Sequence, residues 1–153
     1  MTGPSGFAQP RISAETLHAS TVARDGRAVL ISGPSGSGKS DLALRLLDRG
    51  FTLVSDDQTI VKRDGDRLVA APPPNIAGKL EIRGIGIVEM EHQDAVPVAL
   101  LVELTSDIQR LPDDSRERPI LGISVPLISI DAMTASAPSK VALALERMGL
   151  KLS

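Results

Sequence analysis

The chain has 153 residues, 42% of them hydrophobic and 24% charged, with a net charge of −2 and no cysteine. This length suits one domain around one core. The slight negative charge argues against a nucleic-acid surface. The lack of cysteine excludes disulfides and thiolate metal sites. Because no apolar run approaches about 18 residues and no signal-peptide pattern opens the chain, we expect a cytoplasmic protein that does not contact membranes. Residues 1–10, rich in Gly, Pro and Ser, are predicted to be a flexible tail ahead of a single domain over residues 11–153.

The first third of the predicted domain has the pattern of a hairpin followed by a helix. Residues 17–23 mix apolar and β-branched side chains, and residues 28–31 are a short apolar run, so both are predicted to be strands. The Arg-Asp-Gly-Arg segment between them is typical of a tight turn. Apolar residues recur at helical spacing over residues 41–49, and Gly50 is predicted to end that helix.

The rest of the chain alternates short strands with turns and ends in a helix. We predict strands over residues 51–54, 59–62, 67–70, 80–88, 96–104 and 126–130, a charged loop over residues 107–118 and an amphipathic helix over residues 139–148. The segment over residues 80–88 alternates charged and apolar side chains, as a solvated edge strand does. The whole pattern predicts an α/β fold, with the end of the strand after the first helix lying beside the preceding loop in a parallel sheet.

A glycine-rich segment joins the strand over residues 28–31 to the first helix. It fits the pattern G-x-x-x-x-G-K-[ST] with Gly33, Pro34, Ser35, Gly36, Ser37, Gly38, Lys39 and Ser40. Backbone N–H groups in such a loop bind polyphosphate together with the positive end of the helix. Lys39 is expected to neutralise the β- and γ-phosphates of a nucleotide, and Ser40 to bind the Mg²⁺ that bridges them. The alternative is a glycine-rich turn without a ligand.

Mg²⁺ and a transferred phosphoryl group both need carboxylates near such a loop. Candidates end three predicted strands: Asp56 with Asp57, Glu103, and Asp131. Asp56 and Asp57 are favoured because they end the strand that follows the loop's helix. An isolated aspartate such as Asp131 is as readily explained as a turn or helix cap. His18 alone is more often a structural histidine than a catalytic one.

The nucleotide is predicted to be ATP rather than GTP. Guanine-nucleotide proteins need an Asn-Lys-x-Asp segment that reads the base, and the only asparagine, Asn75, does not begin one. An Asp-x-x-Gly switch segment is missing as well. The residues therefore indicate an ATP-using phosphotransferase or ATPase.

Several segments together resemble the catalytic domain of HPr kinase/phosphorylase, a bacterial enzyme that phosphorylates a serine of the phosphocarrier protein HPr. The family's histidine upstream of the loop falls on His18, its phosphate loop on residues 33–40 and its Val-Ala-Asp-Asp segment on residues 54–57. Its Leu-Glu-Ile-Arg-Gly-Leu-Gly-Ile signature falls on residues 80–87, and its later arginine on Arg110.

The resemblance covers residues 18–130 and implies a P-loop-containing fold like that of phosphoenolpyruvate carboxykinases, with a mixed β-sheet. It further implies use of MgATP, an HPr-like protein as the acceptor, and a homo-oligomer, which in the family is a hexamer. The implied roles are proton acceptor for Asp57 with Asp56 beside it, phosphoryl-charge stabilisation for Lys39, Mg²⁺ ligation for Ser40 and Glu81, and further active-site membership for His18 and Arg110.

Two departures from the family pattern matter. The N-terminal regulatory domain of longer members has no counterpart here, so the chain resembles the short form that is a catalytic domain only. The family's Pro-Val-Arg-Pro-Gly-Arg segment, linked to dephosphorylation, is replaced by residues 131–136, which contain no arginine. We therefore predict a serine kinase whose phosphorylase activity is weak or lost. A small-molecule kinase and a nucleotide-sensing module without turnover are the alternatives.

Overall fold

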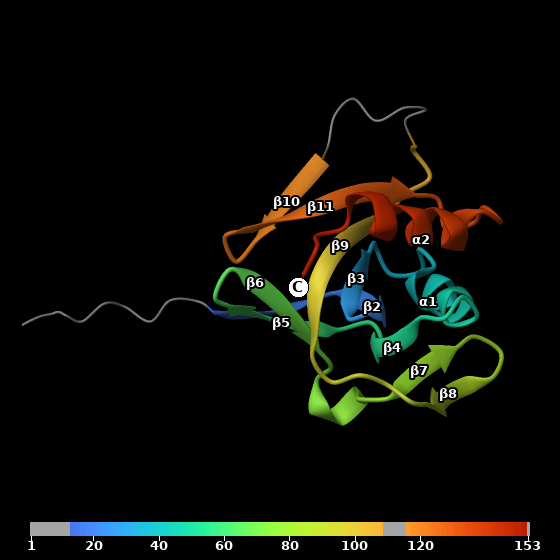
Figure 1. Cartoon of the computed structure of the whole chain (residues 1–153). Coiled ribbons are helices and arrows are strands. Elements are labelled where there is room, and N and C mark those ends of the chain that lie inside the picture. Colours follow the sequence, from blue (N-terminus) through green and yellow to red (C-terminus); the bar gives the residue numbers. More distant parts are fainter. Residues whose placement is uncertain (1–12, 109–115, 153) are drawn as a thin grey trace, which may run out of the picture.

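The chain folds into a mixed β-sheet with the two described α-helices packed on one of its faces (Figure 1). The computed structural model describes residues 13–108 and 116–152. The tail predicted over residues 1–10 therefore lies outside the described residues. Within the described part, neither helix is long and apolar enough to cross a membrane.

The described strands form one large sheet and one separate hairpin. The large sheet contains β1 (Ala14–Leu17), β2 (Ala19–Arg24), β3 (Arg27–Ser32), β4 (Thr52–Ser55), β5 (Thr59–Asp64), β6 (Arg67–Ala71), β9 (Val96–Leu104), β10 (Arg116–Ile120) and β11 (Ile123–Ile130). The hairpin pairs β7 (Lys79–Ile82) with β8 (Gly86–Glu89) and follows a short 3₁₀ helix, η1 (Pro74–Ile76). The α-helices are α1 (Lys39–Leu47) and α2 (Ala137–Met148).

Strand β9 is the centre of the large sheet. It runs parallel to β3 on one side and to β11 on the other, and its first residues pair antiparallel with β6. All its residues except Pro97 and Glu103 are buried, which explains why its sequence is a nearly continuous apolar run. The mixture of parallel and antiparallel pairs confirms the predicted mixed sheet of an α/β fold.

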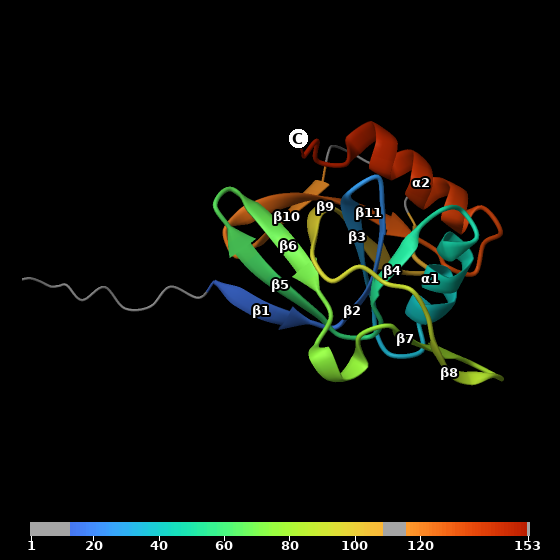
Figure 2. The same cartoon turned by 60° about the horizontal axis from the view of Figure 1, so that its bottom comes forward.

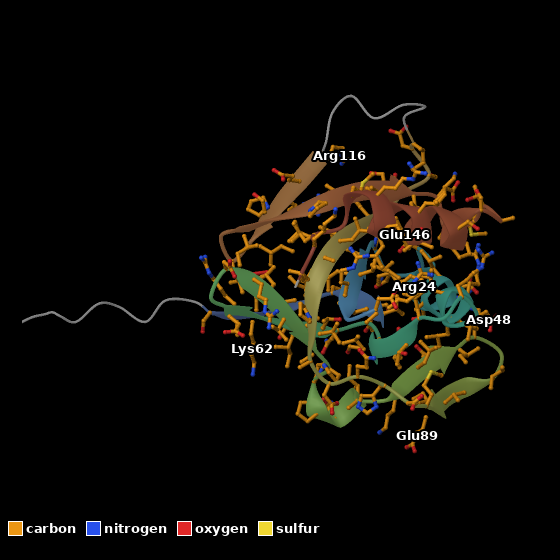
Figure 3. The ribbon with its side chains drawn as sticks, in the orientation of Figure 1. Arg24, Asp48, Lys62, Glu89, Arg116 and Glu146 are labelled. Atoms are coloured by element: carbon orange, nitrogen blue, oxygen red, sulfur yellow. The ribbon has the colours of Figure 1, made fainter. Side chains whose placement is uncertain are left out.

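Two aliphatic clusters stabilise the sheet. The first lies between the helices and the sheet, and its large buried members include Ile31, Leu42, Leu46, Leu100 and Leu145. The second is built by strands and the turn between β10 and β11, and includes Leu30, Val54, Leu68 and Leu101. The rare aromatic Phe51 closes the first cluster, where Arg24 (labelled in Figure 3) lies 4.7 Å from the ring centroid.

The position of β4 corrects one prediction from the sequence. The parallel sheet expected at this place is wrong, because β2 lies between β3 and β4 and pairs antiparallel with both. The cause is the tight turn at Asp25 and Gly26, with φ values of 54° and 74°, which folds β2 directly against β3. Strands β3 and β4 still run in the same direction, so their carboxyl ends lie at the same edge of the sheet.

Three other segments differ from their predictions. The single edge strand expected over residues 80–88 is the β7–β8 hairpin, which turns at Gly84 with φ 89° and pairs with none of the described strands of the large sheet (Figure 2). Residues 116–118, predicted as loop, belong to strand β10, while residues 109–115 of that loop lie outside the described residues. Strand β1 was not predicted, because its mostly exposed residues show no apolar alternation. The other predicted elements are present, with ends shifted by three residues or fewer.

Candidate active site

The loop between β3 and α1 has the backbone that its glycines predict. Gly36 and Gly38 have φ values of 82° and 101°, and Gly38 caps the start of α1. A Cβ on Gly33 would lie 2.6 Å from Ser37 Oγ and 3.2 Å from Leu104 Cβ, so any larger residue would be crowded here. The first N–H groups of a helix have no partners within it. The loop and the start of α1 can therefore bind an anion.

Lys39 opens α1 and extends its side chain back over the loop. It is 6% exposed, and its Nζ donates hydrogen bonds to the carbonyl oxygens of Gly33 at 2.9 Å and Pro34 at 3.1 Å. Among the described residues no carboxylate forms an ion pair with it. A phosphate group would offer this ammonium a charged acceptor in place of two neutral ones, and such hydrogen bonds are stronger.

Ser37 gives a second indication of a ligand. Its Oγ is buried and finds no hydrogen-bond partner within the described ranges. Leaving a buried hydroxyl unpaired costs about 1–3 kcal/mol, which a bound acceptor can offset. An unpaired hydroxyl in the same loop as the Lys39 ammonium fits a nucleotide phosphate.

Asp56 follows β4 directly, and its carboxylate is held by three elements. It is 6% exposed. Its Oδ1 accepts hydrogen bonds from Ser40 Oγ at 2.6 Å and Ser20 Oγ at 2.8 Å, and its Oδ2 accepts one from the Glu81 backbone N–H at 3.1 Å. These donors belong to α1, β2 and β7. A buried carboxylate requires such donors, because burying it unpaired is strongly unfavourable.

Asp57, the next residue, is exposed and has different neighbours. Its Oδ1 lies 3.3 Å from His18 Nε2, and both side chains are more than half exposed. Its backbone N–H donates to Ser20 Oγ at 3.1 Å. Its φ of 68° is in the left-handed region, which few residues other than glycine adopt. This backbone turn sends two successive carboxylates into different surroundings, Asp56 toward α1 and Asp57 toward His18 and solvent.

The oxygen atoms around Asp56 fit a magnesium ion. Ser40 Oγ lies beside Asp56 Oδ1, and Glu81, the other predicted ligand, lines the same cavity as Asp56. Mg²⁺ prefers such oxygen ligands and takes only one or two carboxylates from a protein where phosphates complete its shell. Among the described residues no three His, Asp or Glu side chains gather into a metal cage. A magnesium ion here would therefore also need ligand oxygens.

A cavity of about 310 Å³ lies in front of the two aspartates. It is lined by Asp56, Asp57 and Glu81 together with Ile76, Lys79 and Ile87. The β7–β8 hairpin forms one wall, and its Ile85 and Ile87 are 74% and 69% exposed. Exposed apolar side chains beside a cavity are typical of surfaces that bind another protein.

The other two carboxylate candidates do not join this site. Glu103 accepts a hydrogen bond from Arg118 at 2.7 Å and lies 3.8 Å from Arg116, which Figure 3 labels on β10. Asp131 Oδ1 accepts a hydrogen bond from the Met133 backbone N–H at 2.9 Å. Asp131 therefore caps a turn, which was the alternative explanation for it.

The segment that replaces the family's arginines lies against the phosphate loop. A Cβ on Gly38 would lie 3.3 Å from Ala132 Cβ. Arg45 of α1 donates to the carbonyl oxygens of Ala132 at 2.6 Å and Thr134 at 2.7 Å. The guanidinium of Arg45 is thus used to hold the backbone of residues 131–136.

The structure brings most of the predicted site residues together and adds one. The residues brought together are Lys39, Ser40, Asp56, Asp57, His18 and Glu81. Arg110 lies outside the described residues. Ser20 was missed, because a serine in a short strand belongs to no motif. The only signal was its place two residues after His18 on a predicted strand, where alternate side chains share a face.

Sequence comparison points to one family. The family model of the HPr Serine kinase C-terminal domain matches residues 11–148. A curated HPr kinase/phosphorylase from Chlorobium limicola is 39% identical in an alignment of 130 residues that covers 76% of this chain and 39% of the relative. The HPr kinase/phosphorylase of Pelodictyon phaeoclathratiforme is 36% identical in an alignment of 141 residues that covers 82% of this chain and 43% of the relative. The chain therefore spans about two-fifths of the length of these curated relatives.

Structural comparison agrees. The solved structure of the Hpr(Ser) kinase/phosphatase from Coxiella burnetii matches with a TM-score of 0.75 and 30% sequence identity, over 86% of this chain and 94% of that one. This match confirms the predicted P-loop fold of the phosphoenolpyruvate carboxykinase type. The chain belongs to the family of HPr serine kinase C-terminal domains.

Proposed function

We propose that the chain is a MgATP-dependent serine kinase that acts on an HPr-like phosphocarrier protein. The main support is that the exposed Asp57 carboxylate lies close to the phosphate loop. Ser40, the last residue of the loop, bonds the neighbouring Asp56, and the backbone turn at Asp57 directs its carboxylate to the cavity. A phosphoryl donor bound at the loop would then lie next to a hydroxyl acceptor bound in the cavity. Membership of a family whose relatives are named HPr kinase/phosphorylase supports the choice of acceptor.

Each residue has a role that its surroundings support. Lys39, Ser37 and the loop backbone bind the phosphates of ATP. Ser40, Asp56 and Glu81 would hold Mg²⁺, which would supply charge neutralisation there. Asp56 is buried and already bonded to Ser40, so we assign it to the metal side. We therefore take Asp57 as the base, the role that the family resemblance also implies for it.

The reaction needs one proton acceptor beside the incoming hydroxyl. The serine oxygen of the carrier forms a bond to the γ-phosphorus, the bond from that phosphorus to the β,γ-bridging oxygen breaks, and ADP leaves. The hydroxyl proton passes to Asp57, which His18 approaches to 3.3 Å. Arg110, which lies outside the described residues, is a further member of this site by resemblance alone. The exposed Ile87 at the cavity, with the exposed Ile85 in the same hairpin, supports a protein acceptor over a small molecule.

The test is to incubate the purified protein with MgATP and HPr-type carriers from the same organism, and to locate phosphate by mass spectrometry. We expect one phosphate on one serine of a carrier, and none when that serine is changed to alanine. Transfer to small molecules only would favour the small-molecule kinase. Nucleotide binding without transfer to any acceptor would favour the sensing module. We further propose that residues 11–153 form a single domain and that this domain assembles into a homo-oligomer. Light scattering would measure the mass of the assembly.

A further inference from the structure

We infer that Ser20 is a positioning residue for phosphoryl transfer: its one buried hydroxyl fixes both aspartates and sets the direction in which Asp57 meets the acceptor. This inference rests on the proposed function, because it takes Asp57 as the base. Ser20 belongs to neither the phosphate loop nor the segments that carry the family resemblance.

The contacts of Ser20 use both hydrogen-bonding capacities of its hydroxyl. Ser20 lies in β2 and is 0% exposed. Its Oγ donates its proton to Asp56 Oδ1 at 2.8 Å and accepts the Asp57 backbone N–H at 3.1 Å. A hydroxyl has one proton to donate and two lone pairs that accept. Within the described ranges no other side chain bonds to both aspartates.

The turn after β4 needs this support at its middle residue. Asp57 has a φ of 68°, and a residue persists in that region when its surroundings over-determine it. The ends of the turn are held locally, since Ser55 Oγ bonds the Gln58 carbonyl and the Gln58 N–H bonds the Asp56 carbonyl at 2.7 Å. The Asp57 N–H, between these bonds, has Ser20 Oγ as its partner. Removing that hydroxyl frees the backbone from which the Asp57 carboxylate projects.

The effect of Ser20 on transfer is separable from nucleotide binding. Asp56 keeps its bonds from Ser40 and the Glu81 N–H without Ser20, and Lys39 makes no hydrogen bond to Ser20. Moving a catalytic group by about 1 Å costs on the order of 100-fold in rate. Loss of Ser20 should therefore lower kcat and leave the phosphate loop intact.

Thr21 offers a matched control on the same strand. It is also 0% exposed, and its Oγ1 shares a 2.8 Å hydrogen bond with Thr59 Oγ1, without a bond to either aspartate. Thr21→Val removes a buried hydroxyl at equal depth. A residue that merely stabilises the core would behave as Thr21 does.

The experiment compares Ser20→Ala, Ser20→Thr and Thr21→Val with the wild type. It measures kcat and KM for MgATP with the carrier, ADP affinity by calorimetry without magnesium, and amide exchange at Asp57 by NMR. For Ser20→Ala we expect kcat to fall between about 10-fold and 100-fold, with unchanged ADP affinity. Its Asp57 amide should exchange about 5-fold to 10-fold faster, as expected for one lost hydrogen bond. Ser20→Thr keeps the hydroxyl and should restore most of kcat, and Thr21→Val should stay near wild type.

Equal kcat values for Ser20→Ala and Thr21→Val would overturn the inference, as would a raised KM for MgATP with unchanged kcat. If Ser20→Ala does not fold, Ser20→Cys replaces it, because its thiol has a similar shape and is only a weak donor. A wild type that is inactive on every acceptor would instead contradict the proposed function. Even in that case, an unchanged exchange rate of the Asp57 amide in Ser20→Ala would overturn the positioning role.

Discussion

The phosphate loop and the aspartate pair are joined by the hydrogen bond from Ser40 to Asp56, yet they are built in opposite ways. The loop's internal bonds, such as those from Lys39 to the carbonyl oxygens of Gly33 and Pro34, all fall within eight consecutive residues. The partners of Asp56 come from positions 36, 16 and 25 residues away along the chain. The first region is set by local sequence and the second by the assembled sheet. Nucleotide binding and transfer to serine should therefore be separable by mutation.

The largest expected effect is at Lys39, in the local region. Lys39→Met keeps the buried aliphatic stem and removes the charge, and transfer should fall by about 10²–10³-fold because a preorganised donor to the phosphoryl group is lost. The control is Lys62→Met, an exposed position on β5 that Figure 3 labels. Steady-state rates and thermal unfolding curves measure the two effects. Normal turnover by a folded Lys39→Met protein would refute the phosphate-loop assignment.

The next largest effect is at Asp57, in the assembled region. Asp57→Asn should slow single-turnover transfer by about 100-fold, because it removes the proton acceptor. ADP affinity should stay at the wild-type value.

Asp56→Asn distinguishes the two aspartates. It should also stop transfer, and in addition lower the free energy of unfolding by about 1–3 kcal/mol, because its buried carboxylate accepts three hydrogen bonds. Denaturant titration measures this loss. Full activity in the double variant would exclude the aspartates from the site.

A smaller effect concerns residues 131–136, which touch the loop and not the aspartates. Phosphorolysis of phosphoserine needs inorganic phosphate held beside a second anion, and arginine forks usually bind such groups. Here Arg45 is bonded to backbone carbonyls of this segment. We expect pyrophosphate release from phosphorylated carrier to be at least about 10-fold slower than the forward reaction, since one charge-assisted hydrogen bond already has that effect. Comparable rates in the two directions would show that the missing arginines are not required.

The smallest effect is expected at His18. Its contact with Asp57 is exposed on both sides, and solvent weakens such pairs. His18→Gln should lower kcat by less than about 10-fold, which is below the roughly 100-fold or more that a group taking the proton itself contributes. The same single-turnover assay measures it. A loss as large as that of Asp57→Asn would make His18 an essential member of the site.

The difference between the two regions also explains what the sequence could predict. The phosphate loop could be predicted from a contiguous pattern between a strand and a helix, and β9 could be predicted from a continuous apolar run. Both signals depend only on residues that are neighbours in the sequence. The insertion of β2 between β3 and β4 depends on which strands pair, which local patterns do not specify. The separate surroundings of Asp56 and Asp57 depend on a positive φ at an aspartate, which the sequence does not mark. Glu81 was found through the family resemblance alone.

Parallel pairing of β3 with β9 also affects when a growing chain can bind nucleotide. Ser32, at the end of β3, bonds the carbonyl oxygen of Val102, 70 positions later, at 3.4 Å. Pairs so distant along the chain form late, because the entropy of closing the intervening loop opposes them. A nascent chain that ends at residue 60 already contains all eight residues of the phosphate loop, but lacks the strand that supports β3. Nucleotide affinity should thus appear on the ribosome only after β9 has left the exit tunnel, although the loop itself emerges earlier.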